Sequence, residues 1–222
     1  MAFSSKFLHL IYPPLCSHCQ RRVEDQRPFF CTSCLDYLTL LEAKGRCPLC
    51  FTECSSGACS RCRQRSTAVH SQCAALEPLG PGRTLARYAQ RKDPQAISAA
   101  ASLMAYQWIK LDKKMPDLLL PMPISRWDKW MRNRSADQLL AEALAPLFGV
   151  PVVNALEKSW DHRHFLATAE MRNRFQWNGN TELTDKSILL ISCALDDERI
   201  RRAALALQEA FPSRIDALAL YT

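Results

Sequence analysis

Four C-x-x-C pairs are the residues of this sequence whose spacing points most directly to chemistry: Cys16/Cys19, Cys31/Cys34, Cys47/Cys50 and Cys59/Cys62. Two thiolates three residues apart can approach one ion, and a second pair completes the tetrahedral Cys₄ shell that zinc prefers. Eleven residues separate the first two pairs and eight separate the last two. Consecutive pairing and interleaved pairing, first with third and second with fourth, both remain open. The spacing predicts one or two structural Zn²⁺ ions.

The distribution of all the cysteines also favours a metal site, although the unpaired ones are weaker candidates for ligands. Of the eleven, ten lie between Cys16 and Cys73, and without an export signal such a cluster favours metal over disulfides. Cys54 lies close enough in sequence to replace a neighbouring ligand, whereas Cys73, in the apolar stretch SQCAAL, is expected to be a small buried residue. We expect residues 1–73 to form a double zinc-ribbon-like module. Zinc either only holds this segment together, or the segment presents its positive charge to a phosphate backbone.

A second stretch with the right position for chemistry runs from Lys186 to Phe211. Ser187 to Ile191 is an apolar run typical of a buried strand, and apolar residues recur at helical spacing from Ile200 onward. A strand-to-helix loop in such a fold is a usual ligand site, and a loop that wraps a phosphate needs glycine. The loop between them, Ser192 to Arg199, has no glycine. It instead carries carboxylates that would repel a phosphate, those of Asp196, Asp197 and Glu198.

Basic residues are interleaved with aromatic residues in three segments, 126–134, 158–165 and 172–177. Such mixtures bind single-stranded DNA, because cations contact phosphates while ring faces stack on unpaired bases at ~1–3 kcal/mol each. The alternative is that the rings belong to the core and the arginines form a solvated rim. The predicted DNA-contact residues are Arg126, Lys129, Trp130, Arg132, Arg134, Arg163, Arg172 and Arg174.

Composition and charge agree with a globular protein that has an anionic partner. The 222 residues are 48% hydrophobic with six glycines, and the formal net charge is +7. No apolar run approaches the ~20 residues that a membrane helix needs. The stretch Phe7 to Ile11 is too short and contains His9, so it does not resemble an export signal. We therefore expect a cytoplasmic protein.

The elements that must position these residues alternate between helices and strands. Thr84 to Leu111 is predicted to be helical with an interruption at Asp93-Pro94, and Leu79 to Gly82 is predicted to be a hinge. Alternating strands and helices predict an α/β fold for residues 74–222, with a parallel sheet joined by right-handed crossovers. The predicted strands are Asp117–Met122, Val150–Val153, Ser187–Ile191 and Ile215–Tyr221, and a further helix is Ala136–Leu147.

In this order the motifs resemble the ComF family of competence proteins, including its GntX-type members. These proteins pair an N-terminal cysteine-rich zinc finger with a phosphoribosyltransferase-like domain. The resemblance covers nearly the whole chain and rests on the YPPLCSHC opening, the doubled cysteine pairs, DLLLPMPIS, HFLATAEMRNR and the terminal strand–loop–helix. It implies a phosphoribosyltransferase-like sheet and a role in DNA uptake for natural transformation.

The chain departs from this family at the sites that would carry catalysis. Members have Arg-Gly-Phe-Asn-Gln after the Pro-x-Pro strand, where Arg132 to Ala136 keeps only the arginine. They also have Asp-Asp and a Thr-Thr-Gly loop, which bind the ribose hydroxyls and 5′-phosphate of phosphoribosyl pyrophosphate. The apolar run places Ser192 and Cys193 at the acidic pair and 196–198 at the loop, and shifting the register restores neither motif. The resemblance therefore implies a phosphoribosyltransferase fold with a degenerate phosphate loop.

The resulting prediction is a non-catalytic ComF-like protein that handles incoming single-stranded DNA, with Zn²⁺ but without phosphoribosyl pyrophosphate or Mg²⁺. The enzymatic alternative is an active phosphoribosyltransferase in which Asp196 and Asp197 hold Mg²⁺. The third reading is a zinc-dependent scaffold that docks a DNA-uptake helicase or a recombination mediator without touching DNA.

Overall fold

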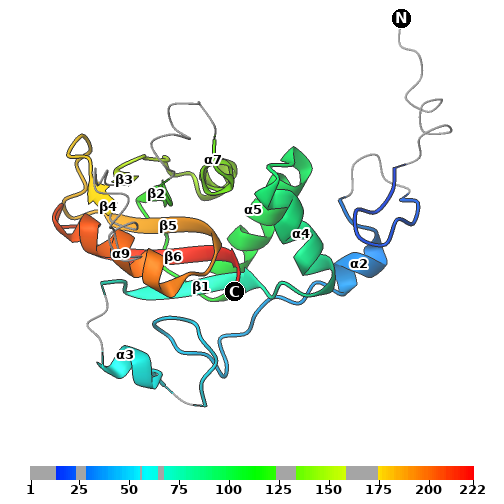
Figure 1. Ribbon diagram of the computed structural model, residues 1–222, viewed down its shortest axis with the longest axis horizontal. Helices are drawn as coiled ribbons and strands as arrows, with labels where there is room; N and C mark the ends of the chain where they lie inside the picture. Colours follow the sequence, from blue (N-terminus) through cyan, green and yellow to red (C-terminus); the bar gives the residue numbers. More distant parts are fainter. Residues whose placement is uncertain (1–13, 24–28, 56, 65–67, 124–133, 159–174) are drawn as a thin grey trace, which may run out of the picture.

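A computed structural model describes residues 14–23, 29–55, 57–64, 68–123, 134–158 and 175–222. At its centre lies a four-stranded sheet in the order β1-β6-β5-β2 (Figure 1). Each strand pair in it is parallel, which confirms the predicted α/β class. The strands are β1 (Ser71–Leu76), β2 (Leu118–Pro121), β5 (Ser187–Ala194) and β6 (Arg214–Tyr221).

The central strand β5 is buried on both faces, as its apolar sequence predicts. Ile188 and Leu190 pack into one hydrophobic cluster, while Leu189 and Ile191 pack into the other. The strand runs three residues beyond the predicted end, because it stays paired with β6 as far as Ala194. The predicted loop from Ser192 is therefore wrong in its extent, and only residues 195 and 196 separate β5 from the next helix.

Helices α4 (Gly80–Gln90), α5 (Pro94–Lys110) and α7 (Ala136–Phe148) supply the helical side of the first cluster. The predicted interruption at Asp93 is confirmed, since its Oδ1 accepts the Ala96 N–H at 2.9 Å and caps α5. The predicted hinge at Leu79 to Gly82 is wrong: these residues are the N-cap and first turn of α4. Pro81 fits there because the first helical turn needs no N–H donor.

The opposite face is covered by α9 (Asp197–Gln208) and by the antiparallel pair β3 (Leu156–Lys158) and β4 (Phe175–Trp177) (Figure 1). Helix α9 begins three residues before the first apolar residue of its pattern, because Asp196 Oδ1 accepts the Arg199 N–H at 3.0 Å. The strand expected at 150–153 is reduced to one parallel bridge, between Val152 and Leu119.

The cysteine-rich segment, with short helices α2 (Thr32–Asp36) and α3 (Ser60–Gln64), covers the outer edge of β1. Leu41 N–H donates to Ala75 O at 3.0 Å, and Gln72 N–H donates to Leu49 O at 2.9 Å. An exposed sheet edge would otherwise offer unpaired backbone groups. The boundary expected at 73/74 passes through β1, and the division into two domains stays a prediction. Within the described ranges, no helix is long and apolar enough to cross a membrane.

Candidate metal centres and the crevice at the sheet edge

The eight cysteines of the C-x-x-C pairs come together as two groups of four, and within each group the Sγ atoms lie within 4.8 Å of one another. The pairing is consecutive rather than interleaved. Zn–S bonds of about 2.3 Å place the sulfurs of a tetrahedral site about 3.8 Å apart, close to the 3.6 Å between Cys19 and Cys31 and between Cys50 and Cys59. Each group therefore fits one zinc ion. Group 1 is Cys16, Cys19, Cys31 and Cys34; group 2 is Cys47, Cys50, Cys59 and Cys62.

The two groups are built alike. Each begins with a tight knuckle in which the residue after the second cysteine has a left-handed backbone, with φ of 61° at Gln20 and 62° at Phe51. That residue donates its N–H to the carbonyl of the first cysteine, at 3.0 Å and 2.9 Å. The remaining two ligands of each group come from a short helix, α2 or α3, and the residue before it. The sequence spacing did not predict this structural repeat.

Backbone amides favour a thiolate at the first cysteine of each knuckle. Burial raises the pKa of Cys16, but N–H groups, including that of Cys19, outweigh it and lower the value to about 6. The pKa of Cys47 is lowered to about 6 in the same way, and the Cys50 N–H is among the groups that lower it. Thiolate is the form that ligates metal, so each knuckle is prepared for an ion.

Group 1 docks on helix α4. His18 Nδ1 lies 2.9 Å from Thr84 Oγ1, and the Phe29 and Tyr88 rings meet edge to face with centroids 5.6 Å apart. Cys16 and Cys34 belong to the same hydrophobic cluster as the helix and sheet residues. The candidate metal centre is thus part of the main core.

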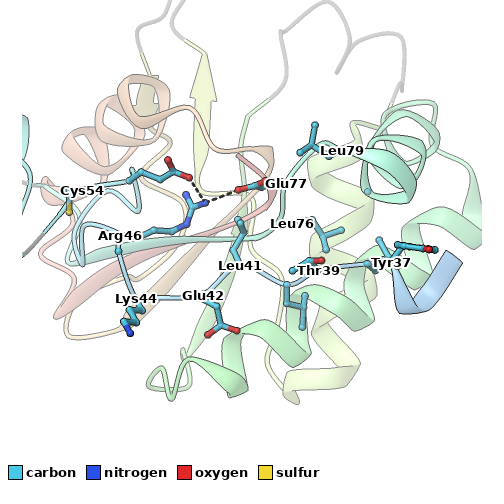
Figure 2. Close-up of a pocket in the computed structure, with 15 residues that line it drawn as sticks. Tyr37, Thr39, Leu41, Glu42, Lys44, Arg46, Cys54, Leu76, Glu77 and Leu79 are labelled. Carbon is cyan, nitrogen blue, oxygen red and sulfur yellow. Dashed lines mark hydrogen bonds and ion pairs between the residues drawn. The ribbon is translucent and has the colours of Figure 1, made fainter. Parts of the chain in front are cut away.

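Group 2 is attached to β1 through Leu49, whose carbonyl oxygen accepts the Gln72 N–H. Beyond the carboxyl end of β1, a pocket of about 660 Å³ is lined by residues that include Arg46 and Glu77. Figure 2 shows Arg46 between two carboxylates, with its Nη2 3.2 Å from Glu53 Oε1 and 3.0 Å from Glu77 Oε1. Leu41 and Leu76 contribute apolar lining. Both carboxylates neutralise the Arg46 guanidinium, whereas Lys44, which also lines the pocket, is exposed. The charged residues of the pocket attach the metal centre to the sheet. Cys54, the predicted spare ligand, instead donates its thiol to Gly57 O at 3.2 Å and lies outside both groups.

The carboxylates of the strand–helix connection are engaged within the protein. Asp196 caps α9, and Asp197 accepts Gln72 Nε2 at 2.8 Å and lies 3.6 Å from Arg61 of α3. Glu198 accepts hydrogen bonds from Arg201 and then Arg202, which lower its pKa to about 2. Negative side chains at a helix N-terminus stabilise the helix dipole. The chain's own carboxylates therefore lie at the N-terminus of α9, where a phosphate group would otherwise bind.

The end of β5 is tied to a residue that sequence reasoning missed. Asp137, in the first turn of α7, is 7% exposed. Its Oδ1 accepts the Cys193 N–H at 2.7 Å, and its Oδ2 lies 3.5 Å from Arg199 Nη2. Burial and then the Asp137 charge raise the pKa of the Cys193 thiol to about 12, which favours the thiol over the thiolate at neutral pH. Ser192 donates its hydroxyl to Ala194 O at 2.8 Å.

Of the predicted DNA-contact residues, Arg134 is described; it is exposed and ion-paired with Glu142. The others lie outside the described residues: Arg126, Lys129, Trp130, Arg132, Arg163, Arg172 and Arg174.

A basic row that the sequence analysis did not single out lies on α4. Arg83, Arg87 and Arg91 are exposed at four-residue steps, and the adjacent group 1 knuckle adds exposed Arg21 and Arg22. Among the described residues, no Asp or Glu forms an ion pair with any of these five arginines. The signal that could have found the row is the recurrence of arginine at i, i+4 and i+8.

No family model and no curated protein matches the chain. A solved structure similar to it is the hypoxanthine-guanine phosphoribosyl transferase of L. donovani, with 12% sequence identity and a TM-score of 0.34, over 62% of this chain and 67% of that one. The α/β assignment itself rests on the sheet and its helices.

Proposed function

We propose that this protein is a ComF-like, non-catalytic protein that handles incoming single-stranded DNA in natural transformation. The observation that carries the proposal is the row of exposed arginines on α4, without carboxylate partners among the described residues. The engaged carboxylates after β5 support the non-catalytic part, because Asp197 and Glu198 are already bound to Gln72, Arg201 and Arg202.

The geometry of the row suits an extended polyanion. Residues four apart on a helix are about 6 Å apart along its axis, so Arg83, Arg87 and Arg91 present charges along about 12 Å of surface. Guanidinium groups bind phosphates through paired N–H donors. Arg87 also lies over the Tyr88 ring, with its Cζ 5.6 Å from the centroid, which restrains a side chain that would otherwise lose entropy on binding.

The test is fluorescence anisotropy of labelled single-stranded DNA with the zinc-loaded protein across a salt series. Each phosphate contact contributes about 0.7 to the slope of log K against log salt for single strands. Replacing Arg83, Arg87 and Arg91 by alanine should therefore weaken binding and reduce the slope by about 2. A parallel variant, Arg132→Ala with Arg134→Ala, tests the contacts predicted from sequence.

The matched control removes three positive charges elsewhere, at the exposed residues Lys44, Lys114 and Lys186. This variant should keep most of the affinity if binding is localised on α4. Equal losses in both triple variants would mean that net charge alone attracts DNA, and the proposal of a site would fail.

Thermal-shift titration with phosphoribosyl pyrophosphate and Mg²⁺ distinguishes the enzymatic alternative from the non-catalytic proposal. A ligand that binds only the folded state raises Tm, so a concentration-dependent rise would favour an active phosphoribosyltransferase. Absence of DNA binding at low salt would favour the scaffold reading, with a DNA-uptake helicase or recombination mediator as the partner.

A further inference from the structure

The sheet contains a point at which its connections change face. β2 and β5 are neighbours; the chain after β2 leads to α7, which packs in one hydrophobic cluster, while β5 leads directly to α9, which packs in the other. In open parallel sheets, ligands bind in the crevice outside the carboxyl ends of the strands at such a switch point. The carboxyl ends of β2 and β5 are thus where an α/β protein would hold a small ligand.

In this protein a side chain lies at the carboxyl ends of these strands. Asp137 Oδ1 accepts the Cys193 N–H of β5 at 2.7 Å. Arg199 of α9 places its Nη2 3.5 Å from Asp137 Oδ2 and 3.5 Å from the carbonyl oxygen of Pro123, just beyond β2. Strand β5, helices α7 and α9 and the residue Pro123 beyond β2 therefore contribute one group each to a single cluster.

The donors in this cluster are those that an anion needs. A backbone N–H at a strand end together with a guanidinium is a common arrangement for binding phosphate or carboxylate groups. Their acceptor here is the carboxylate of the same chain. Hydrogen bonds to charged groups contribute about 1.5–3 kcal/mol each. A carboxylate that the fold already holds in position has an effective concentration far above that of a free millimolar anion.

Asp137 stays in this buried position despite the energetic cost of removing its carboxylate from water. It is 7% exposed, and burial raises the pKa of its carboxyl, while Arg199 and the Cys193 N–H act in the opposite direction. A group that costs desolvation energy is stable there only because both donors are satisfied by it. Removing the carboxylate would leave a buried N–H and a guanidinium without an acceptor.

We propose that Asp137 is an internal anion that occupies the switch point of the sheet, and that Arg199 with the Cys193 amide forms a latent site for phosphate groups. The site stays closed while the Asp137 carboxylate is in place. This inference is independent of DNA binding by α4, because Asp137 and Arg199 lie on other elements, α7 and α9.

The test uses the full, zinc-loaded chain, with inorganic phosphate as the probe and the NMR signal of the Cys193 amide as the readout. In the wild type, phosphate to 20 mM should leave this signal in place. In Asp137→Ala it should shift saturably, with a rise in Tm, and the added change Arg199→Gln should abolish both effects. Glu142→Ala, which removes a carboxylate from the same helix, is the matched control and should behave as the wild type.

Three results would overturn the proposal: a saturable shift in the wild type, no shift in folded Asp137→Ala, or an equal shift in Glu142→Ala. Arg199 is 31% exposed and can turn toward water, which favours folding of the alanine variant. If Asp137→Ala does not fold, Asp137→Ser takes its place, because its short polar side chain removes the charge and does not fill the position of the carboxylate beside the Cys193 N–H. A saturable phosphate shift in that variant supports a latent site, and no shift overturns it.

Discussion

Counting zinc in paired cysteine variants gives the sharpest test of the metal centres. Group 1 and group 2 each unite consecutive C-x-x-C pairs, so serine at the first and second pairs together removes one complete centre and leaves the other intact. We expect two Zn²⁺ in the wild type and one in this variant. Serine at the first and third pairs together damages both centres, and we expect no tightly bound zinc. Interleaved pairing predicts the reverse, no zinc in the first variant and one in the second.

The expected zinc affinity is high enough for the number of bound zinc ions to decide between the two pairings. The 3.6 Å separations between Cys19 and Cys31 and between Cys50 and Cys59 match the roughly 3.8 Å edge of a Zn–S₄ tetrahedron. Structural zinc binds with apparent free energies of about 10–16 kcal/mol at pH 7, which correspond to Kd values between about 10⁻⁷ and 10⁻¹² M. An intact centre therefore keeps its ion through gel filtration at micromolar protein.

The assay is native mass spectrometry with elemental analysis after gel filtration without chelator. Since Cys16 and Cys34 are buried in the core, the variants lose some stability. The wild type loaded with ¹¹³Cd provides a second measurement, in which couplings from each cadmium to cysteine Hβ protons identify its four ligands. A cadmium coupled to both Cys16 and Cys47 would refute consecutive pairing.

Two further predictions concern α4 and α9. Alanine normally favours a helix, but Gly82→Ala should destabilise the protein by about 1–3 kcal/mol in a urea titration. The reason is that the new Cβ would lie 2.5 Å from the Glu77 carbonyl oxygen. The control Ser98→Ala, at an exposed helical position, should be near neutral in the same titration. Glu198 has its pKa lowered to about 2, first by Arg201, so its contribution is present above the unfolded pKa of about 4.3 and is lost as pH falls toward 2. Since its side chain is 42% exposed, Glu198→Gln should cost less than ~1 kcal/mol at pH 7. Its urea midpoint should converge with that of the wild type as the pH falls from about 4 to about 2. A constant gap would contradict the assigned ion pairs.

The sequence was most informative where a local pattern decides the structure. The apolar run at Ser187 predicted a strand covered on both faces, and the alternation of Ile188 and Leu189 between two clusters confirms it. Asp93-Pro94 marked a helix boundary because the acidic side chain caps and proline suits the first turn. Four C-x-x-C pairs predicted metal centres, although spacing alone left their pairing open.

Contacts between distant segments were not accessible in this way. The strand β1 begins with Ser71 and Gln72, whose polar side chains hid a buried strand until pairing with β6 was known. Asp137 looks like an ordinary first-turn acid of an amphipathic helix, and its partner Cys193 is 56 residues away. The register of a sheet and the packing of helices across it bring such groups together. Neither can be read from a single sequence.

The metal centres and the sheet are expected to fold as one cooperative unit. Group 1 contributes Cys16 and Cys34 to the cluster that contains Leu85 of α4. The segment between the groups is held by Gln107 of α5, whose Nε2 donates to Leu41 O at 2.7 Å. Because metal binding energy in such sites is also folding energy, we expect zinc bound there to stabilise the sheet through these shared contacts. The cysteine segment therefore acts as the covering layer of β1 as well as a metal module.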